Sequence, residues 1–358
     1  MKFIALFIME QYQKWLNAIR NSKQPMLTKR LLLQSVEALA ASGAPVVLNL
    51  KHLSLLVGID YPVLQRMLHV KERFYRSYLI KKRDGGERNI DAPYPSLKMV
   101  QRWIVDSILA KTASCHPSSV GFVKGKTTTD NASPHIGHPI LLKMDIKDFF
   151  PSTTERAVKQ YFMSLGYGAE MSTIFAALCS KDSCLPQGAP TSPLLSNVLY
   201  KQMDEELSNL ALSRGLTYTR YADDMSFSGD RISISMIGAV SSIVRKYGLE
   251  INSAKTRRSG KTSRKIITGV SISSGKMTIP RSYKRQIRQK VHYMLQYGVG
   301  NHLKHIGSRD VLAGYRLLGQ LAYWHSIEPD NEYVLKTSAA LLNTLKGANS
   351  KCNCDLKE

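Results

Sequence analysis

Tyr221-Ala222-Asp223-Asp224 interrupts a strand-like run that begins at Leu216 and resumes as Met225-Ser226-Phe227-Ser228. Adjacent side chains on a β-strand point to opposite faces, so two neighbouring aspartates reach one site only if the chain turns tightly there. The stretch therefore predicts a β-hairpin with paired carboxylates at its tip. Such a tip is suited to holding a divalent cation.

A second acidic position lies upstream on another apolar run, Ile140-Leu141-Leu142-Lys143-Met144-Asp145-Ile146. Asp145 and Asp223 are 78 positions apart (223 − 145). Two strands that each end in aspartate can converge and hold two Mg²⁺ ions about 3.5–4 Å apart, the arrangement used for in-line nucleotidyl transfer. These residues predict a nucleic-acid polymerase that uses two magnesium ions.

The charge balance indicates a polyanionic partner. The 358 residues include 50 Lys or Arg and 27 Asp or Glu, a formal net charge of +23, and residues 251–290 hold 12 Lys or Arg and no Asp or Glu. Such a segment repels itself unless a polyanion lies along it. The five cysteines show no CxxC spacing, which argues against a disulfide framework or a zinc site and favours a reducing cytoplasm. No apolar stretch is long enough to span a membrane, so no membrane partner is expected.

Asp84-Gly85-Gly86 lies between two apolar runs and predicts another hairpin within residues 74–91. Its many cations suit it to gripping phosphates. Lys82 and Arg88 are the expected clamps of a triphosphate, and Lys81 could take the place of Lys82 because the register is open. A solvated basic turn is the alternative interpretation, and the carboxylates elsewhere in the chain favour phosphate binding.

Helical patterns account for most of the remaining chain. Residues 281–296 predict a basic helix with Ile287, Val291 and Leu295 on its apolar side. Ser192 is expected to cap a helix whose first residue is Pro193. Residues 265–279 are strand-like. Further helices are expected within residues 1–60, 95–113, 153–180, 231–248, 309–326 and 332–346.

The order of these segments resembles a reverse transcriptase of the retron type, a bacterial family related to group II intron reverse transcriptases. The resemblance runs from about residue 70 to about residue 300, and the ordered set of motifs is more specific than any one of them. The motif Ile267-Thr268-Gly269 departs from the family's usual Val-Thr-Gly only by Ile for Val. The matching segments are Met144-Asp145-Ile146-Lys147-Asp148-Phe149-Phe150-Pro151-Ser152, Leu185-Pro186-Gln187-Gly188-Ala189-Pro190-Thr191-Ser192-Pro193, Tyr221-Ala222-Asp223-Asp224, Asn252-Ser253-Ala254-Lys255-Thr256, Asn131-Ala132-Ser133-Pro134-His135 and Ile267-Thr268-Gly269.

The resemblance implies an α+β right-hand polymerase fold, with fingers, a palm made of an antiparallel sheet plus helices, and a helical thumb. The implied boundaries are an N-terminal helical region over residues 1–70, fingers over 71–140, a palm with interleaved finger elements over 141–275, and a thumb with C-terminal helices over 276–358.

Residue chemistry and the resemblance together assign the catalytic positions. Asp145 and Asp223 are expected to ligate both magnesium ions, and Asp224 is expected to support the site and to ligate a metal transiently. Lys255 is a candidate proton donor to departing pyrophosphate, and an ordinary phosphate contact is the alternative.

Three positions are expected to contact the incoming nucleotide. Phe150 lies five residues after Asp145, where the family places an aromatic ring that excludes a ribose 2′-OH. The alternative for such a ring is a place in the core, and Phe149 is the better candidate for burial. Gln187 is expected to contact the nucleotide, and Gly188 to allow its close approach.

Nucleic-acid contacts are expected from three segments. By resemblance, Asn131, His135 and the segment Ile267-Thr268-Gly269 help to engage the cognate structured RNA. The basic helix should track the phosphate backbone, which produces salt-dependent affinity rather than sequence readout. Its expected contacts are Arg281, Lys284, Arg285 and Arg288.

The resemblance implies an RNA-directed DNA polymerase that copies part of its own structured non-coding RNA (msr–msd) from deoxynucleoside triphosphates. Synthesis would start from a guanosine 2′-OH and leave branched RNA–DNA (msDNA). An effector protein partner and a role in antiphage defence are also implied. Removal of the template by a host RNase H is expected, because the chain after residue 300 is short for such a domain. The alternatives are a group II intron-like or abortive-infection polymerase and a non-catalytic RNA-binding scaffold.

Overall fold

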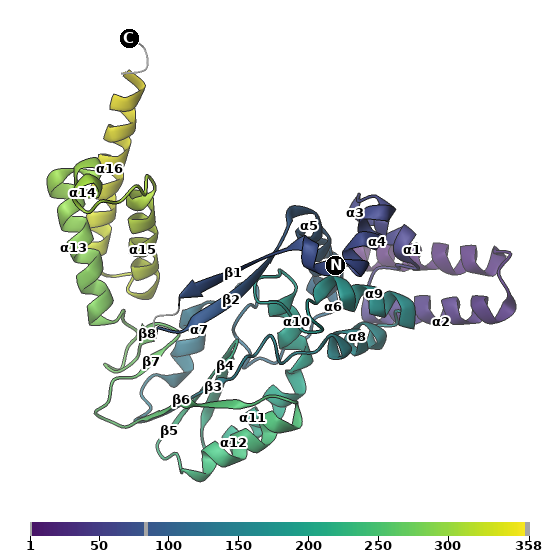
Figure 1. Ribbon diagram of the computed structural model, residues 1–358. Helices are drawn as coiled ribbons and strands as arrows, with labels where there is room; N and C mark the ends of the chain where they lie inside the picture. Colours follow the sequence, from purple (N-terminus) through teal and green to yellow (C-terminus); the bar gives the residue numbers. More distant parts are fainter. Residues whose placement is uncertain (1, 82–84, 355–358) are drawn as a thin grey trace.

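The computed structural model describes residues 2–81 and 85–354, which form an elongated molecule (Figure 1). A helical hairpin projects at one end, a four-stranded sheet with its helices occupies the centre, and a group of helices near the C-terminus stands at the other end. This arrangement of helices around an antiparallel sheet is the α+β architecture that the sequence predicts.

The N-terminal helices form two neighbouring pairs and share a core with helices from later in the chain. Asn49 caps the third helix by accepting a 2.8 Å hydrogen bond from the His52 amide. Leu39, Leu53 and Phe162 belong to one buried cluster, so residues 1–70 are built into their neighbours rather than folded apart. The elements are α1 (Lys2–Asn21), α2 (Met26–Ser42), α3 (Leu50–Val57), α4 (Tyr61–His69) and, sharing this core, α5 (Pro95–Ile104), η2 (Val105–Leu109), α8 (Glu155–Ser164) and α9 (Ala169–Cys179).

A two-stranded hairpin follows the short helix η1 (Lys71–Phe74) and projects toward the C-terminal helices (Figure 1). Strands β1 (Tyr75–Lys81) and β2 (Glu87–Pro93) pair antiparallel, from Tyr75 opposite Pro93 to Lys81 opposite Glu87. The hairpin predicted from Asp-Gly-Gly is confirmed. All residues of β1 after Tyr75 are exposed, whereas Asp91 and Pro93 on β2 are buried, so the accessible part of the ribbon is the end away from Pro93.

The central sheet has the strand order β4-β5-β3-β6, and all its neighbours are antiparallel. Leu142 and Met144 on β3 and Phe227 on β5 pack with Met203 and Val240, so two helices cover one face of the sheet. The alternate residues of β3 face the opposite side, because side chains alternate along a strand. The elements are β3 (Ile140–Ile146), β4 (Thr217–Tyr221), β5 (Asp224–Gly229), β6 (Ile251–Ser259), α11 (Lys201–Ser213) and α12 (Ser235–Lys246).

Three short elements connect the sheet to the rest of the fold: α6 (Ala110–Thr112), α7 (Thr128–Ala132) with η3 (Ser133–His135), and α10 (Ser192–Leu199). The predicted cap of α10 is wrong. Ser192 is the first residue of the helix, and its hydroxyl donates instead to the Pro186 carbonyl at 2.8 Å. The hydroxyl therefore closes the turn before the helix, and Thr191 occupies the N-cap position.

The C-terminal helices pack around their own core. On α13, Ile287, Val291 and Met294 are buried, whereas Leu295 is 38% exposed, so Met294 replaces the predicted Leu295. A spacing of seven residues stays closer to one face of a 3.6-residue helix than a spacing of eight. The strand-like segment contains only two short strands among the described residues. The elements are β7 (Ile266–Ile267), β8 (Val270–Ser271), α13 (Arg281–Tyr297), α14 (Val299–His305), α15 (Ala313–Ile327) and α16 (Glu332–Cys354).

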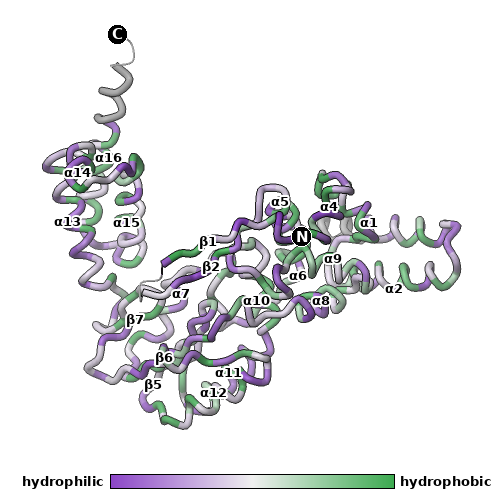
Figure 2. The backbone as a smooth tube through the Cα atoms, in the orientation of Figure 1, coloured by the Kyte–Doolittle hydropathy of each residue, from purple (hydrophilic) through white to green (hydrophobic). Residues whose placement is uncertain are grey.

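Helix α13 is mainly hydrophilic and buries only a few apolar side chains. In Figure 2 most of α13 is coloured toward the hydrophilic end of the scale, as expected for a helix that buries one narrow face. Across the described residues, no helix combines the length and the apolar character needed to cross a membrane.

Candidate active site

The paired aspartates lie at the tip of the β4–β5 hairpin. Tyr221 at the end of β4 pairs with Asp224 at the start of β5, so Ala222 and Asp223 form a two-residue turn. Ala222 has φ 58°, a left-handed conformation that costs a residue with a Cβ about 1–2 kcal/mol. The Asp223 carbonyl accepts a 2.8 Å hydrogen bond from the Ile146 amide, which ties the tip to the end of β3. The predicted hairpin tip is confirmed.

Strand register brings all three predicted carboxylates to one cavity. Asp145 on β3 lies opposite Asp224 on β5 and opposite Asn252 on β6. Asp145 and Lys143 share the face of β3 that points away from α11 and α12. The cavity has a volume of about 580 Å³ and is lined by Arg88, Leu141, Lys143, Asp145, Asp223, Asp224, Lys255, Arg257, Ser259, Arg264 and Ile266.

The carboxylates in this cavity repel one another. Burial raises the pKa of Asp223 above its ordinary value, and the charges of Asp145 and then Asp224 raise it further. Two lysines partly offset this repulsion: Lys255 Nζ lies 3.1 Å from an Asp145 oxygen, and Lys143 Nζ lies 2.8 Å from an Asp224 oxygen. The three acidic groups therefore face two ammonium groups in the cavity.

The chemistry of these residues fits a divalent cation. Carboxylate oxygens are the ligands that Mg²⁺ prefers, and a cation relieves the repulsion that raises the pKa of Asp223. In the part of the chain that the structure describes, no group of three or more His, Cys, Asp or Glu is gathered into a formed metal site. Lys143 and Lys255 would have to release the carboxylate oxygens before a cation could bind them.

Aromatic rings line the approach to the turn. Phe149 is buried, as predicted, and Phe150 is only partly buried. The Phe150 ring lies 6.2 Å from that of Phe122, which in turn lies 6.0 Å from Tyr221, measured between centroids. Phe122 is 41% exposed and has φ 63°. Sequence reasoning missed it, because only the basic residues and glycines of its loop stood out.

The loop that contains Gln187 and Gly188 is hydrogen-bonded to the β1–β2 hairpin, called the finger-like hairpin below. The Asp91 amide on β2 donates to the Gln187 carbonyl at 2.9 Å. Gly188 has φ 136°, and a Cβ there would lie 2.8 Å from the Asp91 carbonyl oxygen. Asp91 also forms an ion pair with Lys181. Gly188 therefore permits close packing against the β2 backbone, and its predicted approach to the nucleotide stays a prediction.

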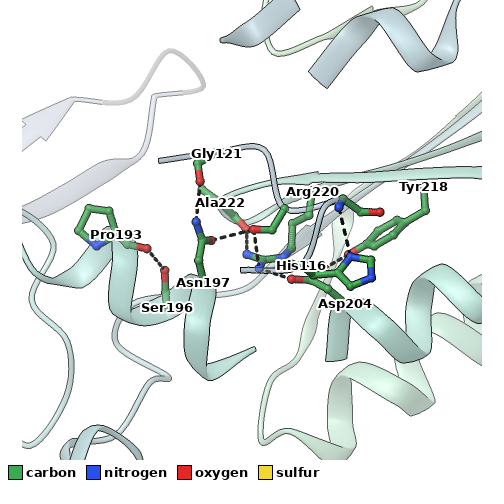
Figure 3. Close-up of polar contacts among 11 residues, drawn as sticks. His116, Gly121, Pro193, Ser196, Asn197, Asp204, Tyr218, Arg220 and Ala222 are labelled. Carbon is green, nitrogen blue, oxygen red and sulfur yellow. Dashed lines mark hydrogen bonds and ion pairs between the residues drawn. The ribbon is translucent and has the colours of Figure 1, made fainter. Parts of the chain in front are cut away.

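A buried ion pair lies directly behind the carboxylate turn (Figure 3). Arg220 and Asp204 are both fully buried, and the guanidinium donates to the two Asp204 oxygens at 2.7 and 2.5 Å. Burial alone would lower the pKa of Arg220, but the charge of Asp204 raises it above its ordinary value, so the guanidinium stays charged. The Tyr218 hydroxyl also donates to Asp204, at 2.8 Å.

The same guanidinium holds the turn. Arg220 donates to the Ala222 carbonyl at 3.0 Å and to Ser119 at 3.0 Å. Asn197 accepts from Ser119 and donates to the Gly121 carbonyl at 2.6 Å, and Figure 3 shows it pointing toward Gly121. A Cβ on Gly121 would lie 2.7 Å from the Ala222 amide nitrogen. The network therefore positions the backbone that carries Asp223.

Sequence reasoning missed this network, although one signal for it exists. Arg220 is two residues after Tyr218 on β4, so the two side chains share a face. An arginine on the buried face of a strand requires an acidic partner. The pattern could have indicated that an acid was needed, but it could not have identified Asp204.

The residues predicted to engage RNA through the Asn131–His135 motif are buried. His135 is fully buried and bridges strands β4 and β5, with its ring nitrogens 2.7 Å from the Ser228 hydroxyl and 2.8 Å from the Thr219 hydroxyl. Burial lowers the pKa of His135 to about 3, so the ring is neutral. The Asn131 side chain donates to the Thr268 hydroxyl at 3.4 Å, which joins the two predicted elements to each other.

The prediction of RNA contact is therefore corrected for part of this set. The side chains of Asn131, His135 and Ile267 have almost no accessible surface, so they support the fold from behind. Thr268 is half-buried and Gly269 is exposed; they form the turn between β7 and β8 with φ values of 45° and 86°. These two residues are the part of the set that can meet a ligand.

The cations of α13 fall into two groups. Lys284 forms an ion pair of 2.6 Å with Glu328 within the helical bundle, and its contact with nucleic acid stays a prediction. The Arg288 guanidinium lies 5.6 Å from the Trp324 ring centroid and 5.0 Å from that of Tyr333. The side chains of Arg281, Arg285 and Arg288 are exposed.

One of the two predicted triphosphate clamps, Arg88, lies at the carboxylate cavity. Arg88 on β2 lines the carboxylate cavity, as does Lys255 on β6. Lys82 lies outside the described residues. The finger-like hairpin thus contributes at least one cation to the cavity that holds the carboxylates.

Comparison with known proteins agrees with this geometry. The family model for reverse transcriptase (RNA-dependent DNA polymerase) matches residues 80–272. The chain is 37% identical over 268 residues to the Retron Ec86 reverse transcriptase of Escherichia coli, covering 74% of this chain and 83% of that protein. It is 31% identical over 311 residues to the Retron Mx65 reverse transcriptase of Myxococcus xanthus, covering 78% and 72%. With this match, the predicted right-hand polymerase fold is confirmed.

Among solved structures, the chain is similar to telomerase from Candida albicans in complex with a fragment of telomeric RNA. The TM-score is 0.41 and the sequence identity 12%, over 76% of this chain and 61% of that one. The matches to the reverse transcriptase family model and to the retron proteins, rather than this distant likeness, bear on the family of the chain.

Proposed function

The chain belongs to the reverse transcriptase family, as an RNA-directed DNA polymerase of the retron type, and we propose that it copies part of its own structured non-coding RNA (msr–msd) into branched msDNA. Synthesis starts from the 2′-OH of a guanosine in that RNA. The observation that supports this most directly is the convergence of Asp145, Asp223 and Asp224 in one cavity whose other walls carry arginine and lysine.

Reverse transcriptase domains use divalent metal ions, and the proposed ions here are two Mg²⁺ held by Asp145 and Asp223 with support from Asp224. When bound, they lower the pKa of the attacking hydroxyl and neutralise the triphosphate. The contribution of the chain is position: Arg220 and the Ile146 amide bind the Ala222 and Asp223 carbonyls, so the backbone of the turn is held in place.

The nucleotide would lie between the carboxylates and the finger-like hairpin. Arg88 would bind the triphosphate, and Lys255, once released from Asp145, would contact a phosphate or donate a proton to pyrophosphate. Phe150 would lie under the sugar, where its ring excludes a 2′-OH. Gln187 would contact the nucleotide from a loop that β2 holds in place.

Several wider features are part of the same proposal. Thr268, Gly269, Arg281, Arg285 and Arg288 would contact RNA, since their surfaces are accessible. The partners would be the cognate RNA, deoxynucleoside triphosphates, an effector protein of an antiphage defence system, and a host RNase H. A cytoplasmic location and the domain boundaries stay predictions.

The test is to express the chain with its flanking genomic DNA, extract nucleic acid, and treat it with RNase and debranching enzyme. We expect a discrete DNA band whose mobility changes on debranching. The double variant Asp223→Ala/Asp224→Ala should lose the band yet keep its affinity for RNA, because the carboxylates hold cations while the basic surface binds phosphate. Asp230→Ala is the matched control, since this exposed aspartate directly follows β5.

Each of the other outcomes would support a different function for this protein. Extension of an added primer–template without a branched product would leave a reverse transcriptase and favour the group II intron-like or abortive-infection alternative. RNA recovered without DNA would favour a non-catalytic scaffold. Synthesis by the double variant would contradict the assignment of Asp223 and Asp224.

A further inference from the structure

Helices α13 and α14 enclose a second cavity at the end of the helical bundle. Its volume is about 370 Å³, within the range of about 300–1,000 Å³ typical of ligand sites. In Figure 1, α14 lies well away from the sheet that carries the carboxylates. The cavity is lined by Tyr293, Tyr297, Asn301, His302 and His305.

Three of these rings form a near-parallel stack. The Tyr293 and His302 planes are inclined by 7° with centroids 5.7 Å apart, and the Tyr293 and Tyr297 planes by 22° with centroids 6.2 Å apart. His302 is buried at the base, whereas Tyr293 and Tyr297 are 38% and 54% exposed. The stack thus continues toward solvent with an aromatic face still accessible.

The surroundings of the stack are cationic. Residues 281–309, which contain both helices, hold seven Lys or Arg and no Asp or Glu. Lys290 precedes Tyr293 by three residues and Tyr297 by seven, so it lies on the same side of α13. Lys304 lies between two of the lining residues, His302 and His305. A ligand that suits both the rings and the charge is planar and attached to a polyanion.

We propose that this cavity binds an unpaired nucleobase of RNA, a site separate from the polymerase cavity. The proposal rests on the proposed function only in taking RNA as the polyanion. The base stacks on Tyr297 and extends the column of rings, because base–aromatic stacking is favourable for every base. Asn301 supplies an amide donor and acceptor, and His305 an imidazole, to the base edge. Lys290 and Lys304 contact the flanking phosphates.

The test measures the binding of short fluorescein-labelled RNA homopolymers, single-stranded or annealed as rA·rU duplex, over a series of salt concentrations. Tyr297→Ala should weaken the binding of a single strand by roughly fivefold to hundredfold. The slope of log Kd against log salt should stay unchanged, because no phosphate contact is lost. Tyr297→Phe should bind as the wild type, and Tyr315→Ala, an exposed tyrosine on α15, is the matched control.

Several results would overturn the proposal: wild-type affinity of Tyr297→Ala for every single strand, an equal loss on duplex, or an equal loss in Tyr297→Phe. A second measurement needs no variant: RNA containing 5-iodouridine should crosslink to α13 or α14, and a crosslink map without these helices would also overturn it. Extension of an annealed primer–template by the same preparations tests the proposed function separately. Failure there leaves the binding result interpretable.

Discussion

Replacement of Arg220 by Met should destabilise the protein strongly, because it leaves a carboxylate buried without its counter-ion. Asp204 is fully buried and now accepts two hydrogen bonds from the guanidinium and one from Tyr218. Breaking a buried pair by removing one partner costs about 3–5 kcal/mol. A domain's free energy of unfolding is about 5–15 kcal/mol, so the loss is a large part of the total.

A second variant separates the ion pair from the turn that it holds. Arg220→Met/Asp204→Leu removes both charges, so most of the stability lost in Arg220→Met should return. Its polymerase activity should stay low, because the Ala222 carbonyl still lacks its donor. Misplacement of a reacting group by about 1 Å can cost about a hundredfold in rate, and we expect a loss in kcat of that order. Affinity for RNA should not change.

The assay is urea unfolding followed by circular dichroism, with primer extension measured on the same preparations. The single variants Arg220→Met and Asp204→Leu complete a double-mutant cycle, and the coupling free energy should be at least about 1 kcal/mol. Arg220→Lys keeps the charge but loses the fork geometry, so it should fall between wild type and Arg220→Met in stability. Strictly additive single losses, or full activity in the double variant, would refute the reasoning.

Three further changes test other contacts. Phe150→Ala should raise the ratio of ribonucleotide to deoxynucleotide kcat/KM by about tenfold or more, and an unchanged ratio would exclude this ring as the gate. Gly121→Ala should lower kcat, and should lower the free energy of unfolding by about 1–3 kcal/mol, because its Cβ would press on the Ala222 amide. A wild-type kcat in this variant would contradict the close contact. His135 binds a proton with a pKa of about 3 when folded and about 6.5 when unfolded, so the unfolded state takes up the proton first as pH falls. From pH 7 to pH 5 the free energy of unfolding of the wild type should therefore fall by about 2 kcal/mol more than that of His135→Gln, as measured by urea unfolding at each pH. If the free energies of unfolding of the two proteins fall in parallel with pH, the His135 ring titrates normally.

Short-range chemistry was sufficient to predict the elements that present the site. Two aspartates between strand-like runs require a turn, and Asp-Gly-Gly between apolar runs requires a hairpin; both are found. Each signal lies within a few neighbouring residues, because turns and strand alternation depend on local backbone geometry. The convergence of Asp145 with Asp223 was predicted from chemistry as well, since a two-metal site needs acids from two strands.

Contacts between distant parts of the chain were decided only by the tertiary structure. His135 and Ser228 are 93 residues apart, Lys284 and Glu328 are 44 apart, and Gly188 meets a strand from the finger-like hairpin. Whether a polar side chain faces a ligand or the interior depends on which segments pack over it, and no local pattern records that. Histidine, lysine and glycine each fit either role, so their chemistry alone could not separate RNA contact from structural support.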